Sequence, residues 1–87
     1  MSSGVYEVRF TRRAEKDVKK LTPQLRRKLR EILAEAIARD PFQGKKLVGD
    51  LAGSYSCRLT YKDRIVYSID APNRVIYVER AATHYGE

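Results

Sequence analysis

A histidine, a tyrosine and an arginine stand close together in the last part of the chain. His84 is the only histidine of the sequence, Tyr85 follows it, and Arg80 precedes it by four residues. Histidine titrates near neutral pH, so it can donate or accept a proton without a large change of its pKa. Arginine forms paired hydrogen bonds with phosphate oxygens. These residue types suit proton transfer at a phosphate. Alternatively, the His-Tyr pair has only a structural role at the end of a strand.

Net charge indicates a polyanionic partner for such a site. The 87 residues include 18 Lys+Arg against 11 Asp+Glu, which gives a formal charge of +7. Basic proteins attract nucleic acid because neutralising phosphates releases counterions. A chain of this length forms one domain, residues 1–87, of which we expect 1–4 to be flexible.

The sequence also indicates a cytoplasmic protein that does not enter a membrane. It has no apolar stretch of the roughly 20 residues that a membrane helix needs, and its first residues lack the apolar block of a signal peptide. Its single cysteine, Cys57, lies in an alternating strand pattern. We interpret it as a small buried apolar residue in a reducing compartment.

Two helices follow a first strand at Val5–Phe10. Thr11 is suited to cap a helix that begins at Arg12, and Thr22-Pro23 has the chemistry of a second helix start. The second helix ends at Asp40-Pro41, since the residue before a proline avoids the helical region. Its apolar residues recur at helical spacing: Leu25, Leu29, Ile32, Leu33, Ala36 and Ile37. The two apolar faces predict an antiparallel helical hairpin.

Three more strands are predicted after a glycine-containing loop that carries Lys45 and Lys46. They cover Ser54–Thr60, Arg64–Ile69 and Arg74–Glu79. The order β-α-α-β-β-β predicts an α+β fold, with the helical hairpin packed on one face of a small, mainly antiparallel sheet.

Alternation along the strands predicts which residues face the helices. The apolar sets are Tyr55, Cys57 and Leu59 on one strand, and Ile65, Tyr67 and Ile69 on the next. Both sets face the helices if Thr60 lies opposite Arg64, with Tyr61–Asp63 as a three-residue hairpin loop. Arg58 and Arg64 then share the face without helices. Arg80 alternates with Ile76 and Val78, which extends this basic face to the last strand.

Such a face suits the cleavage of RNA by its own 2′-hydroxyl. The reaction needs a base for the 2′-OH proton, an acid for the departing oxygen, and cations around the phosphate. Arg58, Arg64 and Arg80 supply the cations, and His84 supplies one proton transfer. Tyr85 can stack on a base or bind a phosphate. One histidine and no Cys or Asp cluster leave no usual metal-ligand set. We therefore expect neither a metal nor another cofactor.

The chain resembles the RelE/ParE superfamily of bacterial toxin–antitoxin toxins, and within it the RelE/YoeB-type mRNA interferases. The similarity rests on the Leu47–Gly53 loop leading into Tyr55–Leu59, on Asp63–Tyr67, and on Arg80 with Thr83-His84-Tyr85. It implies a toxin that enters the ribosome, cuts mRNA in the A site and so inhibits translation. It also implies a cognate antitoxin that binds the basic surface, giving a hetero-oligomer.

The resemblance implies roles for individual residues. Arg64 matches the phosphate-stabilising arginine of the family, His84 and Tyr85 match its catalytic histidine and tyrosine, and Arg58 matches a basic position on the second strand. The remaining predicted RNA-binding residues are Lys45, Lys46, Lys62 and Arg80.

The general base stays open. YoeB-like members have a glutamate in the loop where this chain has Lys45 and Lys46, and RelE-like members have a lysine where this chain has Ser56. The base is therefore His84 or a lysine. Two other functions also remain: a ParE-like toxin that inhibits DNA gyrase without nuclease activity, and a basic RNA- or ribosome-binding module without catalysis. The His-Tyr pair beside an arginine face favours the nuclease.

Overall fold

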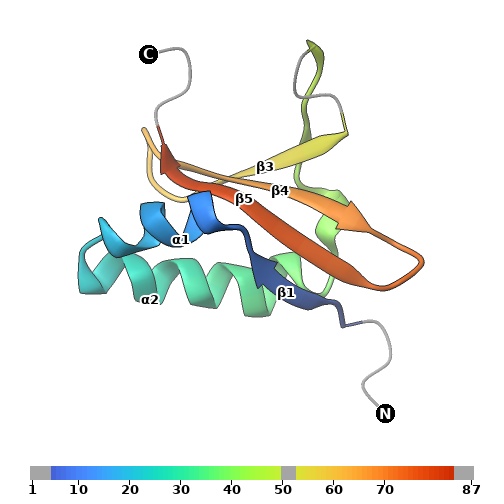
Figure 1. Ribbon diagram of the computed structural model, residues 1–87, viewed down its shortest axis with the longest axis horizontal. Coiled ribbons are helices and arrows are strands. Elements are labelled where there is room, and N and C mark those ends of the chain that lie inside the picture. The colour runs from blue at the N-terminus through green and yellow to red at the C-terminus, as the bar shows by residue number, and fades with distance from the viewer. Residues whose placement is uncertain (1–4, 50–52, 84–87) are drawn as a thin grey trace.

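Two helices cover one face of a five-stranded sheet in the computed structural model, which describes residues 5–49 and 53–83 (Figure 1). The strand order is β1-β5-β4-β3-β2, in which β1 runs parallel to β5 and the other neighbours are antiparallel. The strands are β1 Glu7–Phe10, β2 Lys45–Lys46, β3 Ser54–Arg58, β4 Arg64–Asp70 and β5 Val75–Thr83. The predicted α+β fold, with a helical hairpin on one side of a mainly antiparallel sheet, is confirmed.

Both helices begin where the sequence places their caps. Helix α1 covers Arg12–Lys19, and the hydroxyl of Thr11 accepts a hydrogen bond from the Ala14 amide at 3.2 Å. Helix α2 covers Pro23–Ile32, and Thr22 caps it in the same way. A π-helical turn, η1 (Leu33–Ile37), continues α2, and a 3-10 turn, η2 (Pro41–Gln43), follows. Within the described part of the chain, no helix is long and apolar enough to cross a membrane.

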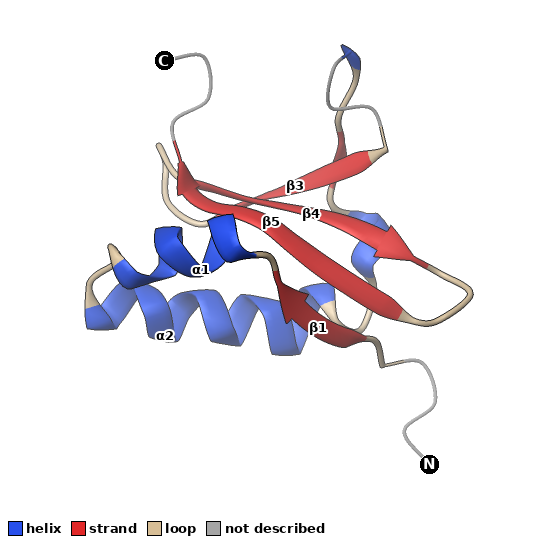
Figure 2. Ribbon diagram, viewed as in Figure 1, coloured by secondary structure: helices blue, strands red, loops and turns tan. Residues whose placement is uncertain are grey.

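Figure 2 shows the strands and helices in separate colours. The strands differ from the prediction at their ends and by one additional strand. The loop after the helices contains a two-residue strand, β2, that pairs with β3 and was not predicted. Strand β3 stops at Arg58 rather than at Thr60. Strand β5 continues to Thr83, past the predicted end at Glu79. The first strand begins at Glu7 rather than Val5.

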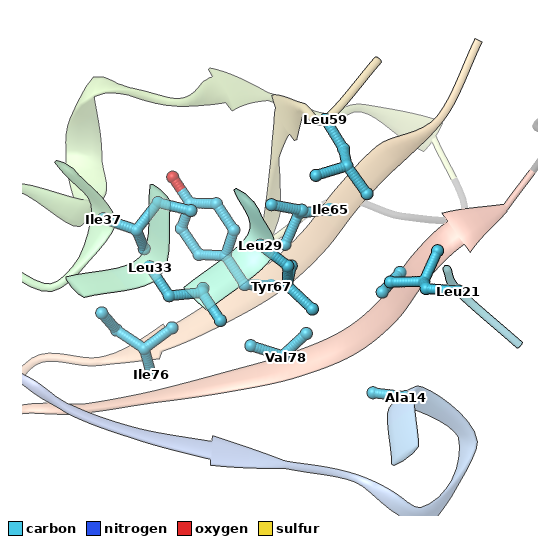
Figure 3. Close-up of a cluster of buried hydrophobic side chains, with 11 residues drawn as sticks. Ala14, Leu21, Leu29, Leu33, Ile37, Leu59, Ile65, Tyr67, Ile76 and Val78 are labelled. Carbon is cyan, nitrogen blue, oxygen red and sulfur yellow. The ribbon is translucent and has the colours of Figure 1, made fainter. Parts of the chain in front are cut away.

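The core lies between the helices and the sheet (Figure 3). Leu29, Leu33 and Ile37 come from α2 and η1. They share one buried cluster with residues of β4 and β5 and of the segment after β3, namely Leu59, Ile65, Tyr67, Ile76, Val78 and Ala81. Tyr55, Cys57 and Ile69 pack against the same cluster. The predicted helix-facing sets of these strands are therefore confirmed.

Candidate nucleic-acid interface

The face of the sheet without helices presents two arginines side by side. Arg58 on β3 lies directly opposite Arg64 on β4, so the prediction that Thr60 lies opposite Arg64 is wrong. The connection is longer than three residues, and the hydroxyl of Thr60 donates to the Asp63 carboxylate at 3.0 Å within it. A shift of two residues preserves the alternation of side chains. Arg58 and Arg64 consequently do share a face, as predicted, and are direct neighbours.

We define the arginine face as this side of β3 and β4, formed by Ser54, Ser56, Arg58, Arg64, Val66 and Ser68. Arg58 is exposed and Arg64 is half-buried. Among the described residues, neither guanidinium has an ion pair or a side-chain hydrogen bond. Like charges directly opposite each other destabilise a strand pair. An anion bound between the two guanidinium groups would remove this repulsion and supply hydrogen-bond acceptors to both.

The predicted lysines divide between different surfaces. Lys45 lies opposite Ser56 and so belongs to the side of the sheet that holds the arginines. Lys46 lies opposite Tyr55, which places it on the side of the helices. Lys62 is exposed in the connection between β3 and β4, and its Nζ lies 5.9 Å from the centroid of the Tyr61 ring. The structure thus brings Lys45 to the edge of the arginine face and separates Lys46 from it.

The position of Arg80 depends on a register shift that the sequence did not indicate. Ile76 and Val78 face the core, so the predicted face shared by these two residues and Arg80 is wrong. The register shifts between Val78 and Arg80, and Arg80 comes to lie opposite Val66. Glu79 is the extra residue of this β-bulge.

The guanidinium of Arg80 is held by helix α1. Its Nε donates to the carboxylate of Asp17 at 2.9 Å, and the Ala81 amide donates to the same oxygen at 3.0 Å. Burial acts to raise the pKa of Asp17, but the hydrogen bonds from Arg80 and Ala81 outweigh it and the pKa is lowered. Arg80 therefore joins β5 to α1 through its ion pair with Asp17.

A carboxylate on this side of the sheet was missed by the sequence analysis. The hydroxyl of Ser54 donates to Oε1 of Glu79 at 3.1 Å, across the intervening strand β4. Ser54 is buried, with 8% of its surface exposed. The one available signal was a charged residue, Glu79, within an otherwise apolar strand sequence. Alternation did not orient it, since both faces of the strand are apolar from Val75 to Val78.

Two predicted catalytic residues, His84 and Tyr85, lie outside the described residues. Within residues 5–49 and 53–83, no group of three His, Cys, Asp or Glu side chains comes together as a metal site. The free thiol of Cys57 is half-buried, and burial raises its pKa. A thiol with a raised pKa is a poor nucleophile at neutral pH, which agrees with the structural role predicted for Cys57.

Comparisons with known proteins give a consistent result. A model of the ParE-like toxin family of type II bacterial toxin–antitoxin systems matches residues 8–86. The toxin RelG of Mycobacterium tuberculosis is 36% identical over 77 residues, which cover 86% of each chain. The structure is similar to the M. tuberculosis toxin–antitoxin complex RelBE2, with a TM-score of 0.82, 33% identity and coverage of 92% and 98%. It is also similar to the Staphylococcus aureus YoeB-YefM complex, with a TM-score of 0.76, 26% identity and the same coverages.

Proposed function

This chain belongs to the ParE-like toxin family of the RelE/ParE superfamily, and from that membership we propose that it is a ribosome-dependent endoribonuclease, an mRNA interferase. It cuts mRNA in the ribosomal A site through attack of a 2′-hydroxyl on the neighbouring phosphate, without a metal ion, and thereby inhibits translation. This function places the protein in the cytoplasm. Similar solved structures are toxin–antitoxin complexes, so a cognate antitoxin forms a hetero-oligomer with it.

The observation that carries the proposal is the pair of adjacent arginines. Arg58 and Arg64 lie directly opposite each other, and within the described residues no acidic side chain neutralises either. During attack by the 2′-hydroxyl, negative charge grows on the phosphate oxygens. Two fixed guanidinium groups stabilise that charge, and one such donor is worth roughly 10²–10³-fold in rate. Lys45 adds a third positive charge at the edge of the face.

The remaining roles follow from the resemblance. His84 transfers a proton and Tyr85 stacks on a base or binds a phosphate. The general base is His84 or a lysine, and Lys45 is the predicted lysine that shares the arginine side of the sheet. Lys62 and Arg80 bind the mRNA or the ribosome beside the site, and Lys46 does so from the helix side of the sheet.

A cell-free translation reaction tests this function by mapping mRNA ends. The wild-type chain should produce new ends within codons, His84→Ala should cut about 10²–10⁴-fold more slowly, and Arg64→Ala about 10²–10³-fold more slowly. Lys28→Ala removes an exposed charge on α2 and serves as the matched control with unchanged cleavage. Arrested translation with intact mRNA, or full cleavage by His84→Ala, would contradict the proposal. A parallel supercoiling assay tests the gyrase alternative directly.

A further inference from the structure

Glu79 is a negatively charged group on a surface that otherwise suits a polyanion. Its carboxylate crosses β4 to reach Ser54, whose hydroxyl donates to Oε1 at 3.1 Å. Ser54 lies opposite Ser68, and both belong to the arginine face. The side chain of Glu79 therefore lies over the same side of the sheet as Arg58 and Arg64, and a buried hydroxyl fixes its orientation.

The carboxylate of Glu79 has no basic partner among the described residues, unlike the carboxylates of Glu7 and Asp17. Glu7 pairs with Arg9, and Asp17 pairs with Arg80. Over residues 5–49 and 53–83, Glu79 has no ion pair, and its one side-chain hydrogen bond comes from a neutral hydroxyl. A carboxylate in this position repels phosphates. It favours RNA binding only where the RNA presents hydrogen-bond donors, and those are on the bases and the 2′-hydroxyls.

The position of Glu79 along the strands favours contact of its carboxylate with a nucleobase over contact with the reacting 2′-hydroxyl. Arg58 and Ser54 are four residues apart on β3, about 13 Å along an extended strand. The Ser54 hydroxyl that holds the Glu79 carboxylate is thus well separated along the strand from the Arg58–Arg64 pair, which favours contact of Glu79 with a neighbouring nucleotide over contact with the sugar of the bound phosphate. A base of a nearby nucleotide in an extended RNA strand lies within reach.

We propose that Glu79, oriented by Ser54, reads the Watson–Crick edge of a guanine in the RNA. Guanine is the base that presents two adjacent donors there, N1–H and the N2 amino group, and a carboxylate has two acceptor oxygens for them. Adenine and cytosine present an acceptor nitrogen beside their amino group, which a carboxylate repels. This inference rests on the proposed function and adds its sequence preference.

Tyr77 supplies the second part of the proposed base site. It lies opposite Ser68, is half-buried, and is two residues from Glu79 on β5. RNA-binding proteins commonly combine a stacking aromatic ring with hydrogen bonds to the edge of an unstacked base. The ring of Tyr77 and the carboxylate of Glu79 provide this combination.

The test measures binding rather than cleavage, by fluorescence anisotropy of the full chain with uncleavable 2′-O-methyl oligonucleotides. The oligonucleotides are uridine heptamers whose central base is uracil, guanine, inosine, adenine or cytosine. The wild type should bind the guanine oligonucleotide at least about tenfold more tightly than the uracil one. Inosine, which lacks the N2 amino group, should be intermediate.

Glu79→Gln should abolish the preference for guanine, because an amide offers one acceptor and one donor in place of two acceptors. Glu31→Gln, an exposed substitution on α2, is the matched control that keeps the preference. Ser54→Ala should reduce the preference without abolishing it, since the carboxylate loses only its orienting partner. Thermal unfolding of each variant confirms that it is folded.

Equal binding of all oligonucleotides by the wild type, or an unchanged preference in Glu79→Gln, overturns this inference and leaves the nuclease function intact. A variant Glu79→Gln that keeps its preference but no longer cuts mRNA also overturns it, because the carboxylate would then act in the reaction. Failure of the wild type to bind any free oligonucleotide also overturns this inference, whereas the nuclease function, which depends on the ribosome, is refuted only by the cell-free translation assay.

Discussion

Replacing Arg58 by glutamine should stabilise the folded protein while weakening its contact with RNA. Arg58 lies directly opposite Arg64, and among the described residues no carboxylate neutralises either charge. Arg58 is exposed, so its removal leaves no cavity. The variant separates the two consequences of this arrangement, because repulsion between the arginines acts in the free protein whereas their attraction to a phosphate acts in the complex.

The expected gain in stability is small and can be calculated. Two unit charges at the roughly 5 Å separation of directly opposite side chains repel each other in water by about 0.8 kcal/mol, and screening at physiological salt reduces this to roughly 0.4 kcal/mol. The value lies within the range of about 0.2–1 kcal/mol for cross-strand pairs. For a domain of this size it corresponds to a rise in Tm of about 2–3 °C.

Thermal unfolding at low and high salt measures this effect. The Tm of Arg58→Gln should exceed that of the wild type in 20 mM NaCl, and the difference should disappear in 1 M NaCl. Inorganic phosphate should stabilise the wild type more than the variant. Arg39→Gln is the contrasting control, since Arg39 pairs with Glu35 at 3.8 Å and its loss should lower the Tm slightly.

Three results would refute the reasoning. An unchanged or lower Tm of Arg58→Gln at low salt means that the two arginines do not repel each other. A gain that persists in 1 M NaCl means that the effect is not electrostatic. Equal stabilisation of both proteins by phosphate means that the paired arginines do not form an anion site.

Two further predictions concern groups whose pKa the fold changes. Asp17→Asn should destabilise the protein at pH 6 by about 1.5–3 kcal/mol, the range for a hydrogen bond to a charged group, and urea unfolding should show this loss shrinking at pH 3. The loss shrinks at low pH because the fold lowers the pKa of Asp17, so the stability that its carboxylate contributes is present above the unfolded pKa and is lost as pH falls. An equal loss at both pH values would contradict the role of the Asp17–Arg80 pair. Tyr67 donates to the Pro41 carbonyl at 2.6 Å, and burial raises its pKa to about 12. The stability of the wild type should therefore decline between about pH 10 and 12. Tyr67→Phe should be less stable than the wild type at pH 7 by about 1–3 kcal/mol, and its stability should decline less steeply at alkaline pH. An equally steep decline in the variant would mean that another group causes the alkaline loss.

The sequence predicted the helices well because their signals are local. Thr11 and Thr22 each bond to an amide three residues later, so the cap and its partner belong to one turn. The apolar stripe of α2 needs no knowledge of its partner to be recognised. The π-helical turn at Leu33–Ile37 was not predicted, since the same stripe continues through it.

The arginine face was predicted correctly even though the register was not. The pairing of Arg58 with Arg64 differs from the predicted pairing by two residues, and a two-residue shift leaves every side chain on its original face. Hydrophobic alternation determines parity, but it does not distinguish registers that differ by an even number. The length of the connection between the strands decides that, and here the Thr60–Asp63 contacts favour the longer one.

The parts of the site that the sequence missed depend on contacts between distant residues. Arg80 and Asp17 are 63 positions apart, and nothing in either neighbourhood indicates their ion pair. The bulge at Glu79 leaves no local mark, because the strand sequence alternates through it. Lys45 joins the arginine side only through a two-residue strand whose pairing with β3 is too short to produce a pattern.

The strand order also determines when, during synthesis, this protein can become a folded molecule. Strand β5 lies between β1 and β4, although it is the last of the strands to be translated. Until residues 75–83 have left the ribosomal exit tunnel, β1 has no neighbour in the sheet and the carboxylate of Asp17 has no partner. The hairpin of β3 and β4 can form earlier, but the helices then have only part of a sheet to cover. A nascent chain therefore cannot complete its sheet until β5 emerges, and the insertion of β5 between β1 and β4 is a late step of folding.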